Sequence, residues 1–223
     1  MSYRHEWKHI INLSDMIILQ GRLPAVMTPD PYAIGGTYEI RSLYFDDPTD
    51  KALREKLDGV NRREKFRIRY YNGDTSLIHL EKKSKIGGLG SKSSAVLTKD
   101  EAQAIASGDY TWMYHSTDPL VTEFYFKLST QQLRPKTVVD YTREPYLFPA
   151  GNVRVTIDYN IRTTLQCTGF LNPECTTIPA GTAPIILEVK WDAYLPDIIR
   201  DAVQLGTRSA CAFSKYAACR LYG

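Results

Sequence analysis

The sequence predicts an α+β fold in which helices flank a largely antiparallel sheet. Several segments alternate apolar and charged residues at period two, which is typical of strands with one buried face. Between them lie segments with apolar residues at helical spacing, which predict helices that cover the sheet. The charged strand faces are rich in arginine and in Glu-x-Lys pairs. If the sheet closes into a barrel, all of these faces can point inward.

The most informative strand is 62–71, because it separates its charges from its apolar residues completely. One face carries the cations Arg63, Lys65, Arg67 and Arg69. The other face carries Phe66, Ile68 and Tyr70. Neighbours on one face lie roughly 6 to 7 Å apart, from a rise of about 3.3 Å per residue. The row of cations fits an exposed edge strand that resists aggregation, or a cationic groove for a phosphorylated ligand. The apolar face favours the groove, because it requires helices to cover it.

The first half of the chain supplies three further strands and two helices. The strands are expected at 4–12, 38–45 and 76–85. Asn72-Gly73 favours a hairpin turn before the last of these. Helices are expected at 14–23, capped by Ser14 and ended by Pro24, and at 50–57. The glycine- and serine-rich segment 87–94 lacks the Walker A pattern and is expected to be a mobile lid or hairpin tip.

The second half begins with helices and continues with strands. Thr98 and Glu101 form a capping box for a helix at 98–106. A second helix follows Asp118-Pro119 and carries an apolar stripe as far as Leu133. Strands are expected at 137–146, 153–165 and 184–191, and helices at 196–205 and 209–221. No repeat or linker interrupts this order, which predicts one domain over residues 1–223.

The net charge, the apolar runs and the cysteines of the chain limit which functions and cellular locations are expected. The 223 residues carry a net charge of only +3, so a basic site must come from arrangement, and nonspecific nucleic-acid binding is not expected. No signal peptide and no apolar run of membrane-spanning length is present, so we expect a cytoplasmic protein. The four cysteines match neither a metal motif nor a secreted disulfide framework. Free thiols are expected, although a Cys167–Cys175 link across a loop stays open.

Two patterns bear on metal binding. His5-Glu6-Trp7-Lys8-His9 matches HExxH, but that motif needs a helix to bind zinc, and this segment is expected to be a strand. The second pattern is Glu-x-Lys, which recurs as Glu6/Lys8, Glu81/Lys83 and Glu188/Lys190. A polyphosphate would balance the cations, and Mg²⁺ or Mn²⁺ would balance the glutamates. Mutual salt bridges explain the residue types equally well.

In order along the chain, a set of short motifs resembles the VTC domain, the catalytic fold of polyphosphate polymerases within the triphosphate tunnel metalloenzyme (CYTH-like) superfamily. The motifs are Arg4–Lys8, Ser42–Asp46, Arg63–Tyr70, Glu81–Lys83, Tyr141–Arg143, Arg154–Asp158, Leu187–Lys190 and Phe213–Tyr216. The resemblance implies a closed antiparallel β-barrel of about eight strands, a triphosphate tunnel flanked by helices.

The resemblance also implies roles for particular residues. Those expected to contact phosphate in catalysis are Lys8, Arg67, Arg69, Lys83, Arg143, Arg154 and Lys215. Arg63, Lys65 and Lys190 are expected to be cofactor-binding residues. Glu188 is the expected ligand of Mn²⁺ or Mg²⁺, with Glu6 and Glu81 as helpers. Arginine suits such a site because its planar fork makes bidentate contacts with phosphate oxygens.

The function implied is a metal-dependent transfer of the γ-phosphate of ATP to a growing inorganic polyphosphate chain. A tripolyphosphatase or nucleoside triphosphatase of the same fold, and a polyphosphate-binding module without catalysis, are the alternatives. The first strand has Arg4 where the wider superfamily has the first glutamate of ExExK, which favours the polymerase branch. Related polymerases work in membrane complexes, so a separate membrane partner is compatible with this chain.

Overall fold

One antiparallel sheet curls around the centre of the molecule. The computed structural model describes residues 4–182, 184–206 and 208–222. The strands are β1 (His5–Ile11), β2 (Thr28–Pro29), β3 (Tyr38–Asp46), β4 (Arg63–Tyr71), β5 (Asp74–Ile86), β6 (Leu89–Leu97), β7 (Arg134–Phe148), β8 (Val153–Thr163), β9 (Ile178–Pro179) and β10 (Ile185–Trp191). Eight of them follow the order β1-β10-β8-β7-β3-β4-β5-β6, with β2 beside β7 and β9 beside β8.

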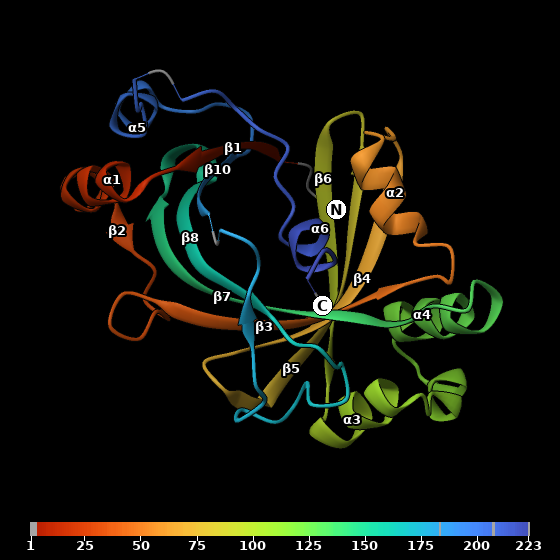
Figure 1. Cartoon of the computed structure of the whole chain (residues 1–223). Helices are drawn as coiled ribbons and strands as arrows, with labels where there is room; N and C mark the ends of the chain where they lie inside the picture. The colour runs from red at the N-terminus through yellow and green to blue at the C-terminus, as the bar shows by residue number, and fades with distance from the viewer. Residues whose placement is uncertain (1–3, 183, 207, 223) are drawn as a thin grey trace.

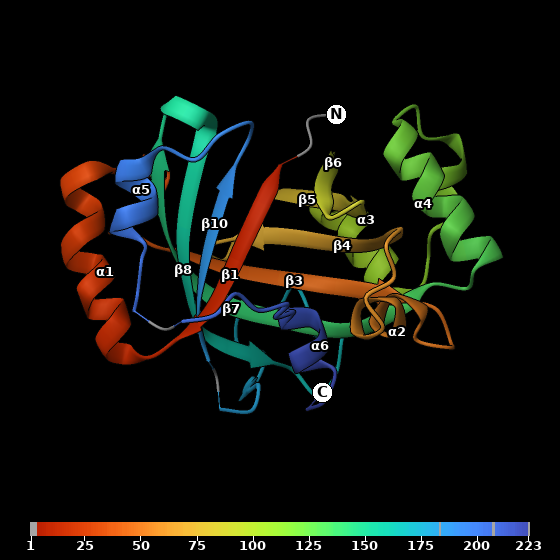
Figure 2. The ribbon, with the colours of Figure 1, turned by 90° about the horizontal axis from the view of Figure 1, so that it is seen from above.

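The helices lie mostly on the outer face of this sheet. They are α1 (Leu13–Val26), α2 (Lys51–Leu57), α3 (Lys99–Ser107), α4 (Pro119–Thr130), α5 (Asp197–Ala202) and α6 (Lys215–Cys219), with 3₁₀ turns η1 (Thr111–His115) and η2 (Ala150–Asn152). In both views, α1 and α5 lie on one side of the curl and α3 and α4 on the other (Figures 1 and 2). The short helix α6 instead lies within the curl (Figure 1) and contacts β7, β8 and α2.

The predicted closure of the barrel is wrong, because its two edge strands do not pair along their length. Among the described residues, β1 and β6 meet at one isolated bridge, in which the Arg4 amide donates to the Gly90 carbonyl at 3.3 Å. The bridge joins only the first residues of the two edges, next to the tip of the β5–β6 hairpin. Beyond it, a salt bridge of 3.3 Å between Lys83 and Glu6 crosses the seam. The sheet is therefore an open, strongly curled barrel.

The outer face of the sheet holds two large apolar clusters. Phe66, Ile68 and Tyr70 of β4 are buried against α3 and α4, as their position on the strand predicted. Phe124 of α4 packs at the centre of this cluster, with its ring stacked on Phe66 at 4.9 Å. The second cluster packs α1 and α5 against β7, β8 and β10. Burial of these faces fixes which side of each strand points inward.

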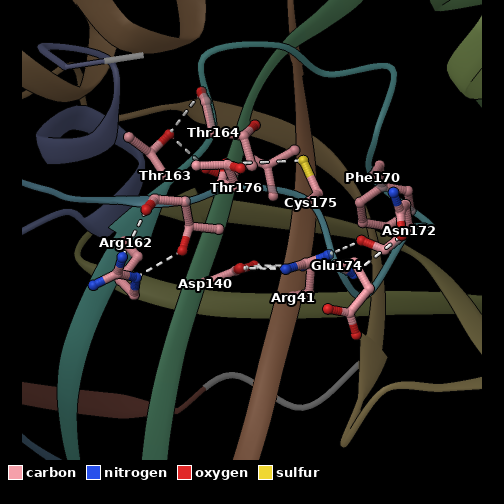
Figure 3. Close-up of polar contacts among 12 residues, drawn as sticks. Arg41, Asp140, Arg162, Thr163, Thr164, Phe170, Asn172, Glu174, Cys175 and Thr176 are labelled. Carbon is pink, nitrogen blue, oxygen red and sulfur yellow. Dashed lines mark hydrogen bonds and ion pairs between the residues drawn. The ribbon is translucent and has the colours of Figure 1, made fainter.

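A loop after β8 covers another part of the outer face. Arg41 of β3 donates to both carboxylate oxygens of Asp140 on β7 and also to the carbonyl oxygen of Asn172 in the loop, at 2.6 Å (Figure 3). The Tyr70 hydroxyl donates to the carbonyl of Phe170 in the same loop. These contacts hold the loop against the sheet. The thiols of Cys167 and Cys175, at either end of this loop segment, are free.

Several predicted boundaries need correction. Asn12, not Ser14, caps α1, and the helix continues past Pro24 to Val26. Of the two alternatives for 87–94, the hairpin tip is confirmed at Gly87-Gly88, but the remainder of the segment belongs to strand β6. The expected helix at 209–221 shortens to α6, which begins after its N-cap Ser214. By contrast, the Thr98–Glu101 capping box of α3 is confirmed, as is the Asn72-Gly73 turn, in which both residues have positive φ.

Candidate active site

The curled sheet encloses a basic cavity of roughly 580 Å³. Its lining, within the described residues, includes fourteen lysine and arginine side chains and three glutamates. The cations are Arg4, Lys8, Lys56, Arg63, Lys65, Arg67, Arg69, Lys83, Lys85, Lys92, Arg143, Arg154, Lys190 and Lys215. The glutamates are Glu6, Glu64 and Glu188. Such an excess of positive charge in a concave site favours a polyanionic ligand.

The structure brings together twelve of the thirteen site residues predicted from sequence. The cavity is lined by Lys8, Arg63, Lys65, Arg67, Arg69, Lys83, Arg143, Arg154, Lys190, Lys215, Glu6 and Glu188. These residues come from β1, β4, β5, β7, β8, β10 and α6, so the curl of the sheet is what makes one site of them. Glu81 is the exception. It lies 2% exposed behind Arg67, outside the lining.

Glu81 therefore occupies a different place from the one expected of a metal ligand. One carboxylate oxygen accepts from Arg67 Nε at 2.7 Å, and the other accepts from Lys92 Nζ at 2.8 Å. Burial acts to raise the pKa of Glu81, but the charges of Arg67, Arg69 and Lys92 outweigh it and lower the pKa well below its usual range. Glu81 thus positions Arg67 and compensates its charge.

Asp158 does the same for Arg143 and Lys215. It is fully buried, and it accepts from Arg143 Nε at 2.7 Å, from Arg143 Nη2 at 2.8 Å and from Lys215 Nζ at 2.5 Å. Burial acts to raise the pKa of Asp158, but the two cations outweigh it and lower the pKa to about 2. Because Lys215 lies on α6, this carboxylate also attaches the last helix to the inner face of the sheet.

Arg69 is held by hydroxyl groups instead of a carboxylate. Its Nε donates to Ser42 Oγ at 2.8 Å, and its Nη2 donates to the Tyr141 hydroxyl at 3.2 Å. In Arg69 and Arg143, Nε and one terminal nitrogen are held from within the protein. In Arg67 all three nitrogens are held, because Nη2 also lies 2.6 Å from Glu81 and Nη1 donates to the Tyr44 hydroxyl. The remaining N–H groups of each fork are thereby oriented before any ligand arrives, which lowers the entropic cost of binding.

Glu188, Glu6 and three lysines form a second charged cluster at the β1–β10 side of the cavity. Glu188 accepts from Lys8 at 3.1 Å and also contacts Lys190, while Glu6 lies 3.3 Å from Lys83 and 3.4 Å from Lys8. Burial acts to raise the pKa of both glutamates, but these cations outweigh it. They lower the pKa of Glu6 to about 2 and hold that of Glu188 well below its usual range.

Two lysines of the cavity have lowered pKa values, which favour the neutral amine and not the charged form. Burial lowers the pKa of Lys65 to about 8, and the neighbouring cations Arg67 and Lys8 add to the effect. Burial and the charge of Lys8 likewise lower the pKa of Lys83 to about 7. Lys65 has no carboxylate within salt-bridge distance among the residues described, and its ammonium lies 5.1 Å from the centre of the Tyr44 ring. In this part of the cavity no carboxylate therefore compensates the Lys65 ammonium directly.

The donor set fits a divalent cation that arrives with a phosphate. Glu188 and Glu6 both line the cavity and contact the same lysine, so their carboxylates face one region. Mg²⁺ and Mn²⁺ sites often combine one or two carboxylates with phosphate oxygens. In the described part of the chain, this cavity included, no group of three or more His, Cys, Asp or Glu side chains is placed to hold a metal. The HExxH segment is strand β1, as expected.

Sequence reasoning missed several residues that support this site, among them Ser42, Tyr141 and Lys92, which hold Arg69 and Glu81. Asp158, Tyr44 and Tyr216 belong to motifs that were noted, but none was predicted as a site residue. Tyr44 and Tyr216 stack at 5.0 Å, and the Tyr216 hydroxyl donates to Asp46 at 2.7 Å. The signal available for Tyr44 was its position in strand 38–45, two residues from Ser42, on the face that points inward. Which inward residues meet which arginine depends on strand pairing, which the sequence does not state.

The chain is thus an open, curled antiparallel barrel with an inward-facing basic lining. The family model of the VTC domain matches residues 3–222. The chain therefore belongs to the VTC domain family. No curated protein matches it.

A solved structure with a TM-score above 0.5 supports the fold. A candidate adenylate cyclase from Bacillus halodurans is 15% identical, with a TM-score of 0.52 over 85% of this chain and 80% of that one. The PH1012 protein of Pyrococcus horikoshii is 12% identical, with a TM-score of 0.47 over 95% and 96% of the two chains. At such identities the likeness of the Bacillus protein concerns the fold alone. In the described segments, no helix is long and apolar enough to cross a membrane.

Proposed function

We propose that this protein is a metal-dependent polyphosphate polymerase that transfers the γ-phosphoryl group of ATP to the end of an inorganic polyphosphate chain. The observation that carries the proposal is the composition of the cavity, where lysine and arginine side chains from nine elements line one space of roughly 580 Å³. Membership of the VTC domain family supports the same ligand class.

The reaction needs no protein nucleophile. A terminal phosphate oxygen of the chain forms a bond to the γ-phosphorus of ATP while the bond to the β-phosphate oxygen breaks, and ADP leaves. Catalysis of phosphoryl transfer depends mainly on positioning and on charge stabilisation. Arg67, Arg69 and Arg143 would supply both, because each fork is already held from behind.

Glu188 and Glu6 would hold a Mn²⁺ or Mg²⁺ ion, which would neutralise charge on the phosphate oxygens. In the ligand-free protein, Lys8 and Lys190 form salt bridges with the carboxylate oxygens of Glu188. When a metal and a phosphate chain bind together, those lysines would contact phosphate oxygens in place of the carboxylate. The charges of the cluster would thereby be compensated both with and without ligand.

The test is incubation of the purified protein with ATP and Mn²⁺, followed by ³¹P NMR and gel analysis of the products. Long-chain polyphosphate together with ADP supports the proposal. Free phosphate without polymer would instead indicate a triphosphatase, and binding without turnover would indicate a polyphosphate-binding module.

Glu188→Gln attributes any activity to this cavity. We expect kcat to fall about 100-fold or more, the scale on which loss of one preorganised electrostatic group acts, because the main metal ligand is lost. Tripolyphosphate binding without metal should persist, since Lys8 and Lys190 stay cationic. Glu174→Gln, on the exposed part of the outer loop, is the matched control and should retain full activity. Full activity in Glu188→Gln would refute the metal assignment.

A further inference from the structure

The side chain of Tyr44 reaches the cavity from β3, and its hydroxyl accepts a hydrogen bond but donates none to the described residues. The residue is 4% exposed and lines the basic cavity. Its hydroxyl oxygen accepts a hydrogen bond from Arg67 Nη1 at 2.7 Å. Among the residues that the structure describes, no acceptor takes the hydrogen of this hydroxyl. A buried hydroxyl normally uses its donor as well as its acceptor capacity.

The groups around Tyr44 are cationic or aromatic. From β4, Arg67 donates to its hydroxyl, and Lys65 lies over its ring. Arg69 adds a third positive charge from the same strand. From α6, Tyr216 stacks on the ring, and from β5, Glu81 reaches this region only through Arg67. From β7 the cross-strand neighbour is the uncharged Thr137. No carboxylate in the described segments contacts the Tyr44 hydroxyl.

We propose that Tyr44 is a ligand-binding residue of the basic cavity, whose hydroxyl accepts from Arg67 and donates its hydrogen to an oxygen of the bound phosphate chain. The inference rests on the proposed function for its ligand. Its geometry follows from the cavity itself, because a phosphate that contacts Arg67 also comes within reach of the hydroxyl that Arg67 touches.

The proposal has a consequence for protons. Burial acts to raise the pKa of Tyr44, but the charges of Arg67, Lys65 and Arg69 outweigh it and lower the pKa to about 7. A phosphate chain brings negative charge to those cations, so it raises the pKa again and favours the protonated phenol. At pH 8 a larger fraction of Tyr44 is therefore phenolate in the free protein than in the complex. Binding takes up a proton at this residue.

The experiment is ultraviolet difference spectroscopy at 295 nm, where phenolate absorbs, during titration with tripolyphosphate in the absence of metal. At pH 8 we expect binding to lower the absorbance of the wild-type protein, and at pH 6, where Tyr44 is already protonated, we expect little change. Tyr44→Phe should lose the absorbance change. Its affinity for tripolyphosphate should fall by a factor of up to about ten, as expected for a lost hydrogen bond to a charged group. Tyr114→Phe, on an exposed turn at η1, should keep both signal and affinity.

The outcomes separate the inference from the proposed function. If the wild-type protein binds tripolyphosphate with no change at 295 nm at pH 8, and Tyr44→Phe binds equally well, Tyr44 is not a ligand-binding residue while the polyphosphate site stands. If the wild-type protein does not bind tripolyphosphate at all, both fall. Where Tyr44→Phe fails to fold, Tyr44→Leu takes its place in both measurements, and binding of tripolyphosphate by that variant as tightly as by the wild-type protein overturns the inference.

Discussion

Replacing Asp158 by asparagine removes one negative charge from behind the cavity wall while nearly preserving the shape of the side chain. In the wild-type protein this carboxylate is fully buried and holds Arg143 and Lys215 at distances of 2.5 to 2.8 Å. The variant leaves two buried cations without their shared carboxylate. It also loosens α6, because Lys215 is part of that helix.

The loss in the free energy of unfolding caused by Asp158→Asn can be estimated in two ways. Removing one partner of a buried ion pair typically costs about 3 to 5 kcal/mol, because the other partner is left uncompensated. The pKa of Asp158 gives a lower figure. Burial acts to raise it, but Arg143 and Lys215 lower it from 3.8 to about 2, a shift equivalent to about 2 kcal/mol of stability. We therefore expect Asp158→Asn to lower the free energy of unfolding by about 3 kcal/mol.

The assay is urea unfolding at pH 7, followed by far-ultraviolet circular dichroism. Because the pKa of Asp158 is depressed in the folded state, its contribution is present above the unfolded pKa and is lost as the pH falls toward 2. The difference between wild type and Asp158→Asn should stay constant from pH 8 to 5 and shrink below pH 4. Asp197→Asn, which removes an exposed partner of Arg200, is the control and should change stability by about 0.5 kcal/mol or less.

A difference below about 1 kcal/mol at pH 7, on the scale of an exposed ion pair, would refute the argument. It would mean that water or a rearranged lysine compensates the two cations as well as Asp158 does. A large difference that persists unchanged to pH 3 would refute the charge explanation and indicate loss of packing instead.

Two further predictions concern the cavity and the core. Arg67→Ala should weaken tripolyphosphate binding about tenfold or more and flatten its dependence on salt, measured by isothermal titration calorimetry at several salt concentrations, while the exposed-site variant Arg200→Ala should change neither. Unchanged affinity in Arg67→Ala would leave β4 as a purely structural charged strand. Phe124→Ala should lower the free energy of unfolding by about 3 to 5 kcal/mol, because its ring is fully buried against Phe66, whereas Phe126→Ala on the exposed side of the same helix should cost far less. Equal effects of the two alanine variants, measured by urea unfolding, would contradict the assignment of the core face of α4.

The facing of the strands could be predicted from sequence because alternation at period two is a local property. The cations of β4 point inward and Phe66, Ile68 and Tyr70 point outward, as the pattern indicated. The same reasoning predicted that the glutamates of β1, β5 and β10 share the inner face with lysines. Local patterning therefore sufficed for twelve of the thirteen predicted residues, but not for Glu81 or for the lining residues Tyr44, Lys56 and Lys92.

Features that depend on partners elsewhere in the chain were not predictable in this way. The segment 89–97 is rich in glycine, serine and lysine and becomes strand β6 because β5 pairs with it. Pro24 removes one amide near the end of α1, and the burial of Leu19 and Leu23 keeps the helix intact across it. The prediction of a closed barrel was wrong because closure requires β1 and β6 to stay side by side beyond their single bridge. A local sequence pattern does not encode any of these contacts between distant segments.

The position of Glu81 behind Arg67, outside the cavity lining, has a physical consequence for the whole site. Alternation places a residue on the inner face, but it does not say whether that residue reaches the cavity or stays behind a longer neighbour. Arg67 and Arg143 are longer than the glutamate and aspartate that hold them, so Glu81 and Asp158 lie behind the arginine forks. The carboxylates thereby reduce the repulsion among buried cations without occupying the cavity. This arrangement lets the empty protein fold with its arginines already oriented, so ligand binding requires little reordering of these side chains.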